Sequence, residues 1–172
     1  MKINDQGIDP NRFIVIPRTL IFLFDSDDRI LLIKGSPKKK RWAGVYNGIG
    51  GHIEPNENIL DAAGRELYEE TGIKEGKLYL CGQVMISNLN NPGIALFIFN
   101  GFVEKTEVRS SREGELHWIP IQKVNEFPLV DDLRVLLPLV AKHQQGDPII
   151  IGKYIENQQD GDLEFLFQCE DS

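Results

Sequence analysis

The chain has 172 residues, of which 41% are apolar and 26% are charged. These values fit a folded domain with its own core, and they exclude a largely disordered chain and a protein built from long apolar spans. The formal net charge of −7 repels nucleic acid and anionic membranes, so a polyanionic ligand has to be met by local cations or by a metal ion.

The N-terminal segment and the cysteines bear on the compartment. Residues 1–10 are polar and lack the charged-then-apolar pattern of a signal peptide. Cys81 and Cys169 show no CxxC or other metal-ligand spacing, so neither a disulfide framework nor a zinc site is predicted. We therefore expect a cytoplasmic protein with no membrane contact and no stable nucleic-acid partner.

The first half of the chain predicts a hairpin, a loop and a helix. Apolar runs at 18–25 and 29–34, joined by a short polar turn, predict a β-hairpin with buried strands. Residues 35–44 hold Gly, Pro and four consecutive cations, which predicts an exposed irregular loop. An apolar stripe predicts a helix over 57–71, with Asn56 as its N-cap and a glycine just after its end.

The second half adds strands and one further helix. Apolar runs at 78–87 and 94–104, on either side of a turn that contains Asn and Pro, predict two strands. Residues 116–121 predict another short strand. Leucines and valines at helical spacing predict a second helix over 130–143, which its internal proline is expected to kink or shorten.

The tail and the overall pattern indicate the fold class. Apolar runs at 149–155 and 163–167 surround a polar stretch and predict a terminal hairpin. Mixed strands with only two substantial helices favour a sheet covered on its faces, an α+β or α/β sandwich. We expect one domain over 1–172, with 146–172 as a hairpin extension for packing or dimerisation, so a homodimer is compatible with the sequence.

Three glutamates in the first predicted helix carry the main chemical signal. Glu66, Glu69 and Glu70 are spaced i, i+3 and i+4, so they share one side of the helix, where like charges repel. The helical period puts Glu66 and Glu70 at the edge of the apolar stripe instead of opposite it. A hard divalent cation, Mg²⁺ or Mn²⁺, would relieve that conflict and suits phosphate chemistry. The alternative is an exposed acidic face with Arg65 as an ion-pair partner.

The residues around these glutamates decide between the two interpretations. From Gly51 to Ile73 the sequence reads GHIEPNENILDAAGRELYEETGI. This segment resembles the Nudix box, G-x5-E-x7-R-E-U-x-E-E-x-G-U with U apolar, at every defined position. So many fixed positions at fixed spacing argue against chance, and they fall on a predicted loop and helix, the context that the motif requires. The resemblance implies an α/β/α sandwich with a mixed sheet and a hydrolase of diphosphate bonds.

The resemblance also implies roles for individual residues. The three helix glutamates, Glu66, Glu69 and Glu70, would bind the metal ion, with the backbone carbonyl of Gly50 as a further ligand. Arg65 would orient the carboxylates, and the Glu57 side chain would pair with Arg65.

A further carboxylate is expected from the loop at 110–118. Relatives often supply one there, and this loop offers Glu113 and Glu115, of which we choose Glu113; a solvated loop is the alternative. The general base is left open among Glu66, Glu69 and Glu113. The implied reaction is attack of water on one phosphorus of a diphosphate, assisted by a carboxylate base and by the metal ion.

The glycine-rich segment bears on the substrate. Residues 46–51, YNGIGG, resemble the W/Y-N-G-x-G-G segment of MutT-like 8-oxo-dGTP diphosphatases, in which the asparagine contacts the purine. We therefore expect Asn47 and Gly51 in the substrate site, although Asn47 can equally satisfy a turn. Arg41, at the end of the basic run, is a candidate for drawing phosphates toward the metal ion, with a solvated basic loop as the alternative. The neighbouring Trp42 can stack on a base or serve in packing.

These residues lead to one main hypothesis and two alternatives. The main hypothesis is a Nudix hydrolase that uses Mg²⁺ or Mn²⁺ to cleave a nucleoside triphosphate or another nucleoside-diphosphate-linked substrate, with oxidised purine nucleotides as one specific case. The second keeps the chemistry and changes the substrate to a nucleotide sugar, a dinucleotide or capped RNA. The third is a non-catalytic nucleotide-binding regulatory module, since fold does not imply function; the intact box argues against it.

Overall fold

The computed structural model describes residues 7, 9, 11–38, 42–74, 76–87, 92–104, 107–156 and 163–168. In this described part of the chain, the regular elements are eight strands, two α-helices and the 3₁₀ helix η2. In chain order they are β1 (Val15–Asp25), β2 (Arg29–Gly35), β3 (Tyr46–Asn47), α1 (Ile59–Thr71), β4 (Lys77–Ile86), β5 (Gly93–Val103), β6 (Gly114–Pro120), η2 (Ile121–Glu126), α2 (Leu133–Lys142), β7 (Ile150–Glu156) and β8 (Leu163–Gln168).

The strands form one mixed sheet in the order β3-β2-β1-β5-β4-β7-β8, with β6 also paired to β2. β1 runs parallel to β5 along its whole length, and β4 is antiparallel to β5 and parallel to β7. β7 and β8 pair antiparallel, so the terminal hairpin predicted from the sequence is confirmed. Through β7 this hairpin extends the main sheet.

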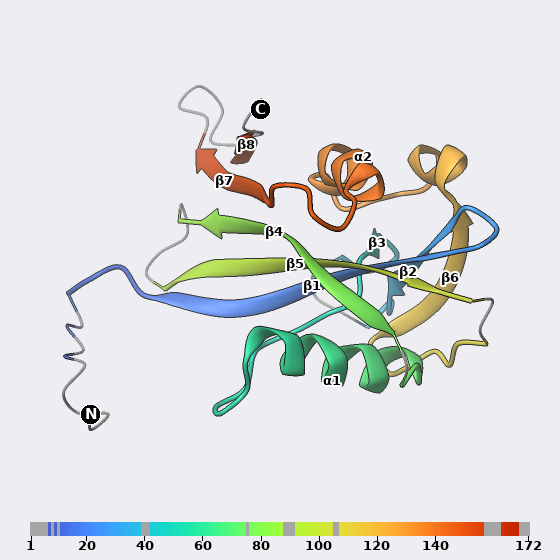
Figure 1. The fold of residues 1–172 in the computed structure, drawn as a ribbon, viewed down its shortest axis with the longest axis horizontal. Coiled ribbons are helices and arrows are strands. Elements are labelled where there is room, and N and C mark those ends of the chain that lie inside the picture. The colour runs from blue at the N-terminus through green and yellow to red at the C-terminus, as the bar shows by residue number, and fades with distance from the viewer. Residues whose placement is uncertain are drawn as a thin grey trace.

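Helices cover both faces of the sheet, with α1 on one side and α2 on the other (Figure 1). Side chains of β1 alternate between two apolar clusters, as expected for a strand that is buried on both faces. Ile21 and Leu23 pack with Ala63 and Leu67 of α1. The other cluster joins β1 to the α2 side of the sheet through Leu20, Phe22, Leu133, Leu136, Leu137 and Val140. The sandwich predicted from the sequence is therefore present.

α1 begins two residues later than predicted, and Asn58, not Asn56, is its N-cap. The Asn58 side chain accepts from the backbone N–H groups of Leu60 (2.9 Å) and Asp61 (3.0 Å). Asn56 lies in a turn with φ +71°. The predicted cap was wrong because the chain is still turning at Asn56, where the Glu57 side chain accepts from an upstream backbone N–H instead.

α2 also starts later than the predicted residue 130. The backbone N–H of Val130 donates to the carbonyl of Tyr46 (3.0 Å), and the N–H of Tyr46 donates to the carbonyl of Pro128 (2.7 Å). Pairing with β3 thus keeps the chain extended up to Val130, and the helix follows only after a turn. Pro138 lies inside the helix. None of the helices in the described part of the chain has the length and apolar character that a membrane span requires.

Candidate active site

A cavity of about 680 Å³ opens where the glycine segment, α1 and the loop before β6 meet. That volume is in the range of small-molecule sites. The residues that line it are Arg18, Ile33, Gly35, Trp42, Val45, Asn47, Gly48, Gly50, Gly51, His52, Glu54, Glu66, Glu69, Glu70, Ser111, Arg112 and Glu113. The cavity therefore joins the predicted metal-binding glutamates to the predicted substrate residues Asn47 and Gly51.

α1 presents its three glutamates to this cavity from differently exposed positions. Glu70 is buried, with 8% of its surface exposed, whereas the Glu69 side chain is 58% exposed. The Glu66 side chain is 14% exposed. Glu66 and Glu70 thus lie at the boundary of the core, where the helical period predicts them, and an acidic face turned fully to solvent is excluded.

The glycine segment is fixed to β1 by backbone hydrogen bonds. Ile21 and Ile49 exchange hydrogen bonds of 2.7 and 3.1 Å, and the N–H of Thr19 donates to the carbonyl of Gly51 (2.9 Å). At Gly50, φ is +142° and a Cβ would overlap the Thr19 carbonyl. A Cβ at Gly51 would overlap the carboxylate of Glu66. Gly50 is required by its positive φ and by the close backbone, whereas Gly51 leaves room for the side-chain end of Glu66.

Arg65 connects the helix carboxylates to the loop before α1. Its Nε and Nη2 atoms donate to the two carboxylate oxygens of Glu57, at 2.6 and 2.9 Å. Nη1 donates to Glu66 (2.8 Å) and Glu69 (3.3 Å), and Nη2 also donates to the carbonyl of His52 (2.9 Å). The hydrogen bonds from Arg65 lower the pKa of Glu57 to about 2, and the same contacts raise the pKa of Arg65. The predicted pairing of Glu57 with Arg65 is confirmed.

The helix carboxylates face different partners. Glu66 and Glu69 point to Arg65, while Glu70 accepts from the backbone N–H of Gly50 (3.2 Å). Accordingly, no cluster of three or more His, Cys, Asp or Glu side chains arranged to hold a metal ion occurs among the residues that the structure describes. The fit to a hard divalent cation therefore rests on the chemistry of the donors, since carboxylate oxygens and a backbone carbonyl are the ligands that Mg²⁺ prefers.

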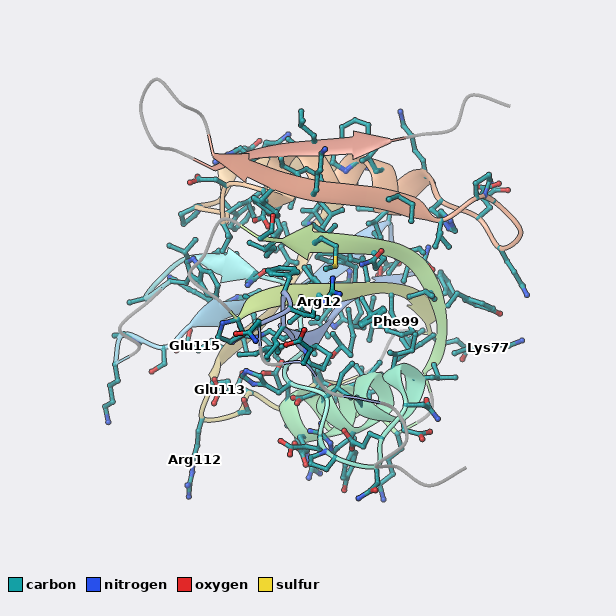
Figure 2. The ribbon with its side chains drawn as sticks, turned by 90° about the vertical axis from the view of Figure 1, so that its left-hand side faces the viewer. Arg12, Lys77, Phe99, Arg112, Glu113 and Glu115 are labelled. Atoms are coloured by element: carbon teal, nitrogen blue, oxygen red, sulfur yellow. The ribbon has the colours of Figure 1, made fainter. Side chains whose placement is uncertain are left out.

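Of the two glutamates predicted in the loop at 110–118, Glu113 lies in the loop just before β6, while Glu115 lies on β6 itself. Glu113 lines the cavity, whereas Glu115 is not among its described lining residues and lies 3.6 Å from His117. The backbone carbonyl of Glu113 accepts from the N–H of Ser36 (3.1 Å), which fixes this loop against the end of β2. In Figure 2 the neighbouring Arg112 side chain extends away from the body of the fold.

Of the predicted substrate residues, Asn47 and Gly51 line the cavity. The side-chain oxygen of Asn47 accepts from the N–H of Gly48 (2.8 Å), so Asn47 serves a turn while it lines the cavity. Trp42 is 48% exposed at the cavity, with φ +59°. Its carbonyl approaches Gly35 so closely that a Cβ there would overlap it. Arg41 lies outside the described residues.

Several lining residues are not predicted by any motif. His52 and Glu54 occupy unspecified positions of the box, and Ser111 comes to the cavity only through the pairing of β6 with β2. Arg18 is the first residue of the apolar run predicted at 18–25, where a charged residue is commonly a solvated strand end, but it lies inside β1, which begins at Val15. An arginine at that position gave no local signal of a site.

The sequence profile of the NUDIX domain matches residues 16–140. The chain belongs to the NUDIX family. The matched region runs from β1 to α2 and leaves out the terminal hairpin.

Curated relatives and solved structures agree with this assignment. The chain is 27% identical over 141 residues to the oxidized purine nucleoside triphosphate hydrolase of Danio rerio. The aligned region covers 77% of this chain and 89% of the relative. The chain is 27% identical over 145 residues to the Mus musculus protein of that name, with 84% and 89% covered. The MutT protein from Bacillus halodurans has the same fold, with a TM-score of 0.70 at 24% identity over 89% of this chain and 97% of that structure. The predictions of the family, of its fold and of a hydrolase acting on a diphosphate linkage are confirmed.

Proposed function

We propose that this NUDIX hydrolase converts a nucleoside triphosphate to a nucleoside monophosphate and diphosphate, with purine nucleotides that carry an oxidised base as its main substrates. The observation that carries the proposal is the single cavity that joins the α1 glutamates, the glycine segment and Asn47. Two relatives that align over more than three quarters of this chain are named as hydrolases of oxidised purine nucleoside triphosphates, which supports the same substrate class.

Mg²⁺ or Mn²⁺ is the proposed cofactor. Glu66, Glu69 and Glu70 would hold the ion, with the backbone carbonyl of Gly50 as a further donor. When bound, the ion supplies positive charge that offsets the charge developing on the phosphate oxygens.

The chain itself holds the substrate and removes a proton. A water oxygen forms a bond to one of the two phosphorus atoms of the linkage, the bridging P–O bond breaks, and the group on its other side, diphosphate or the nucleoside monophosphate, leaves with the electron pair of that bond. Glu66, Glu69 or Glu113 accepts the proton of the attacking water. Arg65 holds Glu66 and Glu69 through its contacts of 2.8 and 3.3 Å, and so acts as a positioning residue.

The nucleoside end would lie against Asn47 and Trp42. The Asn47 oxygen is engaged by the N–H of Gly48, which leaves the Asn47 amide N–H₂ group as a donor toward a base. The half-exposed indole of Trp42 offers an aromatic face for stacking. Both residues line the same cavity as the carboxylates.

The test is diphosphate release with Mg²⁺ from a panel of compounds: dGTP, 8-oxo-dGTP, a nucleotide sugar, a dinucleoside polyphosphate and capped RNA. We expect the highest kcat/KM for 8-oxo-dGTP. Glu69→Gln should lower kcat by roughly 10²- to 10⁴-fold, the scale of a lost acid–base or charge-stabilising group. The matched control Glu115→Gln, outside the cavity, should stay within about twofold of the native chain.

The panel also separates the alternatives. A higher kcat/KM for the sugar, dinucleoside or RNA compound would replace the proposed substrate while keeping the chemistry. Tight binding of a nucleotide without release of diphosphate by the native chain would instead identify a regulatory module.

A further inference from the structure

Arg18 is a cation without a partner in the part of the chain that the structure describes. It lies on β1 and lines the cavity, and its Nε atom is buried with no hydrogen-bond partner. No hydrogen bond or ion pair of its guanidinium occurs among the described residues. A buried N–H without an acceptor is unfavourable, so a group that remains unpaired in a cavity wall indicates a missing ligand.

Three acidic side chains of the cavity, Glu66, Glu69 and Glu70, already have partners other than the Arg18 guanidinium. Arg65, the arginine of the box, already engages Glu57, Glu66 and Glu69. The Glu70 carboxylate accepts from the N–H of Gly50. Five glutamates line the cavity with Arg18, yet none of these described residues accepts a hydrogen bond from the Arg18 Nε. The unpaired guanidinium therefore indicates an anion supplied from outside.

The position of Arg18 on β1 shows which part of a nucleotide it would meet. Its backbone bridges to His52, and the N–H of the next residue, Thr19, donates to the carbonyl of Gly51. Arg18 is thus adjacent to the segment against which the Glu66 carboxylate packs. It is not adjacent in the sheet to Trp42, where the base is proposed to stack.

Strand alternation separates Arg18 from the glutamates. Leu20 and Phe22 pack in the cluster on the α2 side, so Arg18, which shares their alternation, is on that side of β1. The carboxylates of α1 approach the glycine segment from the opposite face. A polyphosphate that crosses Gly50 and Gly51 would meet carboxylates and metal ion on one side and a guanidinium on the other.

We propose that Arg18 binds the phosphate chain of the substrate and thereby anchors it against the glycine segment; this inference rests on the proposed function. A guanidinium binds phosphate oxygens through two parallel N–H groups, a geometry that a lysine ammonium does not offer. Arg18 is therefore a binding residue that sets affinity for the polyphosphate, and it takes no part in proton transfer.

The first experiment measures binding of the α,β-imido analogue of dGTP with Mg²⁺ by calorimetry, and KM and kcat for 8-oxo-dGTP. Arg18→Gln should weaken binding and raise KM by about ten- to a hundredfold, the scale of a hydrogen-bonded charge pair, with a smaller change in kcat. Arg18→Lys should recover only part of the affinity. The control Arg134→Gln removes the same charge from the exposed side of α2 and should bind like the native chain.

A second measurement uses the native chain and does not depend on the folding of a variant. The ¹H–¹⁵N signal of the Arg18 Nε–H should shift, and its hydrogen exchange should slow, when the imido analogue is added. An unchanged signal, while the amide signals of Gly50 and Gly51 shift, would overturn the inference.

The outcomes distinguish the inference from the proposed function. Turnover by the native chain with unchanged KM and affinity in Arg18→Gln would reject the role of Arg18 and leave the proposed function in place. Failure of the native chain to bind the analogue or to release diphosphate would reject both.

Discussion

Arg65 is held by Glu57 through two parallel hydrogen bonds, from Nε at 2.6 Å and from Nη2 at 2.9 Å. Glu57 precedes the first residue of α1, so this pair joins the loop to the helix. The remaining guanidinium nitrogen reaches Glu66 and Glu69. A residue outside the helix therefore determines where two of its carboxylates lie.

The Glu57–Arg65 pair should make stability depend on acid pH. The pKa of Glu57 is lowered from 4.5 to about 2 by the hydrogen bonds from Arg65. Between those values the unfolded chain binds more protons than the folded chain, so this contribution is present above pH 4.5 and is lost as the pH falls toward 2. The free energy of unfolding of the native chain should exceed that of Glu57→Gln near pH 7, and the difference should shrink in acid. A difference that stays constant with pH would contradict the ion pair.

Two glycine-to-alanine substitutions should have opposite consequences. A Cβ at Gly51 would overlap the Glu66 carboxylate, the mobile end of a side chain, so Gly51→Ala should fold but displace Glu66. Its kcat should fall by roughly 10- to 100-fold, because a small misplacement of a reacting group is that costly. At Gly64, inside α1, a Cβ would meet nothing within 4 Å. Gly64→Ala should keep its activity and gain about 0.5–1 kcal/mol of stability. Equal activity of the two variants would show that Glu66 does not depend on Gly51.

Periodic apolar segments made most of the fold predictable from the sequence. The strands predicted at 78–87 and 94–104 differ from β4 and β5 by one residue at each end. The start of α1 was not predictable, because Asn56 and Asn58 are both good N-caps. The choice depends on the hydrogen bond between Glu57 and the N–H of Glu54, which no helical pattern reveals.

The candidate site was predictable where it is local to the box. The spacing of the α1 glutamates follows from helical geometry alone, and Glu66 and Glu70 lie at the core boundary as that geometry requires. Arg18 comes to the cavity through pairing between segments that are distant in the sequence. Its unpaired Nε is a property of the packed structure, so no motif could indicate it.

Divalent cations should stabilise the chain through the helix carboxylates. At a concentration of about 100 times Kd, Mg²⁺ binding to the folded state contributes about 2.7 kcal/mol, which raises Tm by roughly 5–10 °C for a chain of this size. Glu70→Gln keeps an acceptor for the N–H of Gly50 but removes the charge, and should lose most of this shift. Glu115→Gln, outside the cavity, should retain it. Differential scanning calorimetry with EDTA or Mg²⁺ checks the prediction, and an equal shift in Glu70→Gln would rule out Glu70 as a metal ligand.

The hydroxyl of Tyr154 should stabilise the junction between α2 and the terminal hairpin. Tyr154 on β7 donates to a carboxylate oxygen of Asp132, and the other oxygen of Asp132 is buried with no partner among the described residues. Tyr154→Phe would leave the carboxylate poorly satisfied and should cost about 1–3 kcal/mol in urea unfolding. Tyr79→Phe, at a tyrosine of β4, is the matched control and should stay within about 0.5 kcal/mol. A cost no larger than that of the control would show that the contact is not made in solution.

Asp132 itself should make the chain less stable at neutral pH than an uncharged residue would. Burial raises the pKa of Asp132 above its ordinary 3.8, and the hydrogen bond from Tyr154 opposes this only in part. Just above pH 3.8 the folded chain then binds more protons than the unfolded chain, so stability falls as the pH rises through the window between the two pKa values. Asp132→Asn keeps an oxygen that can accept from Tyr154 and removes the charge. It should therefore be more stable than the native chain at pH 7, and this gain should disappear below pH 3.8. Urea unfolding of both proteins from pH 3 to 7 measures this difference in stability. If the native chain gained stability relative to Asp132→Asn as the pH rises, the carboxylate would be satisfied in its charged form.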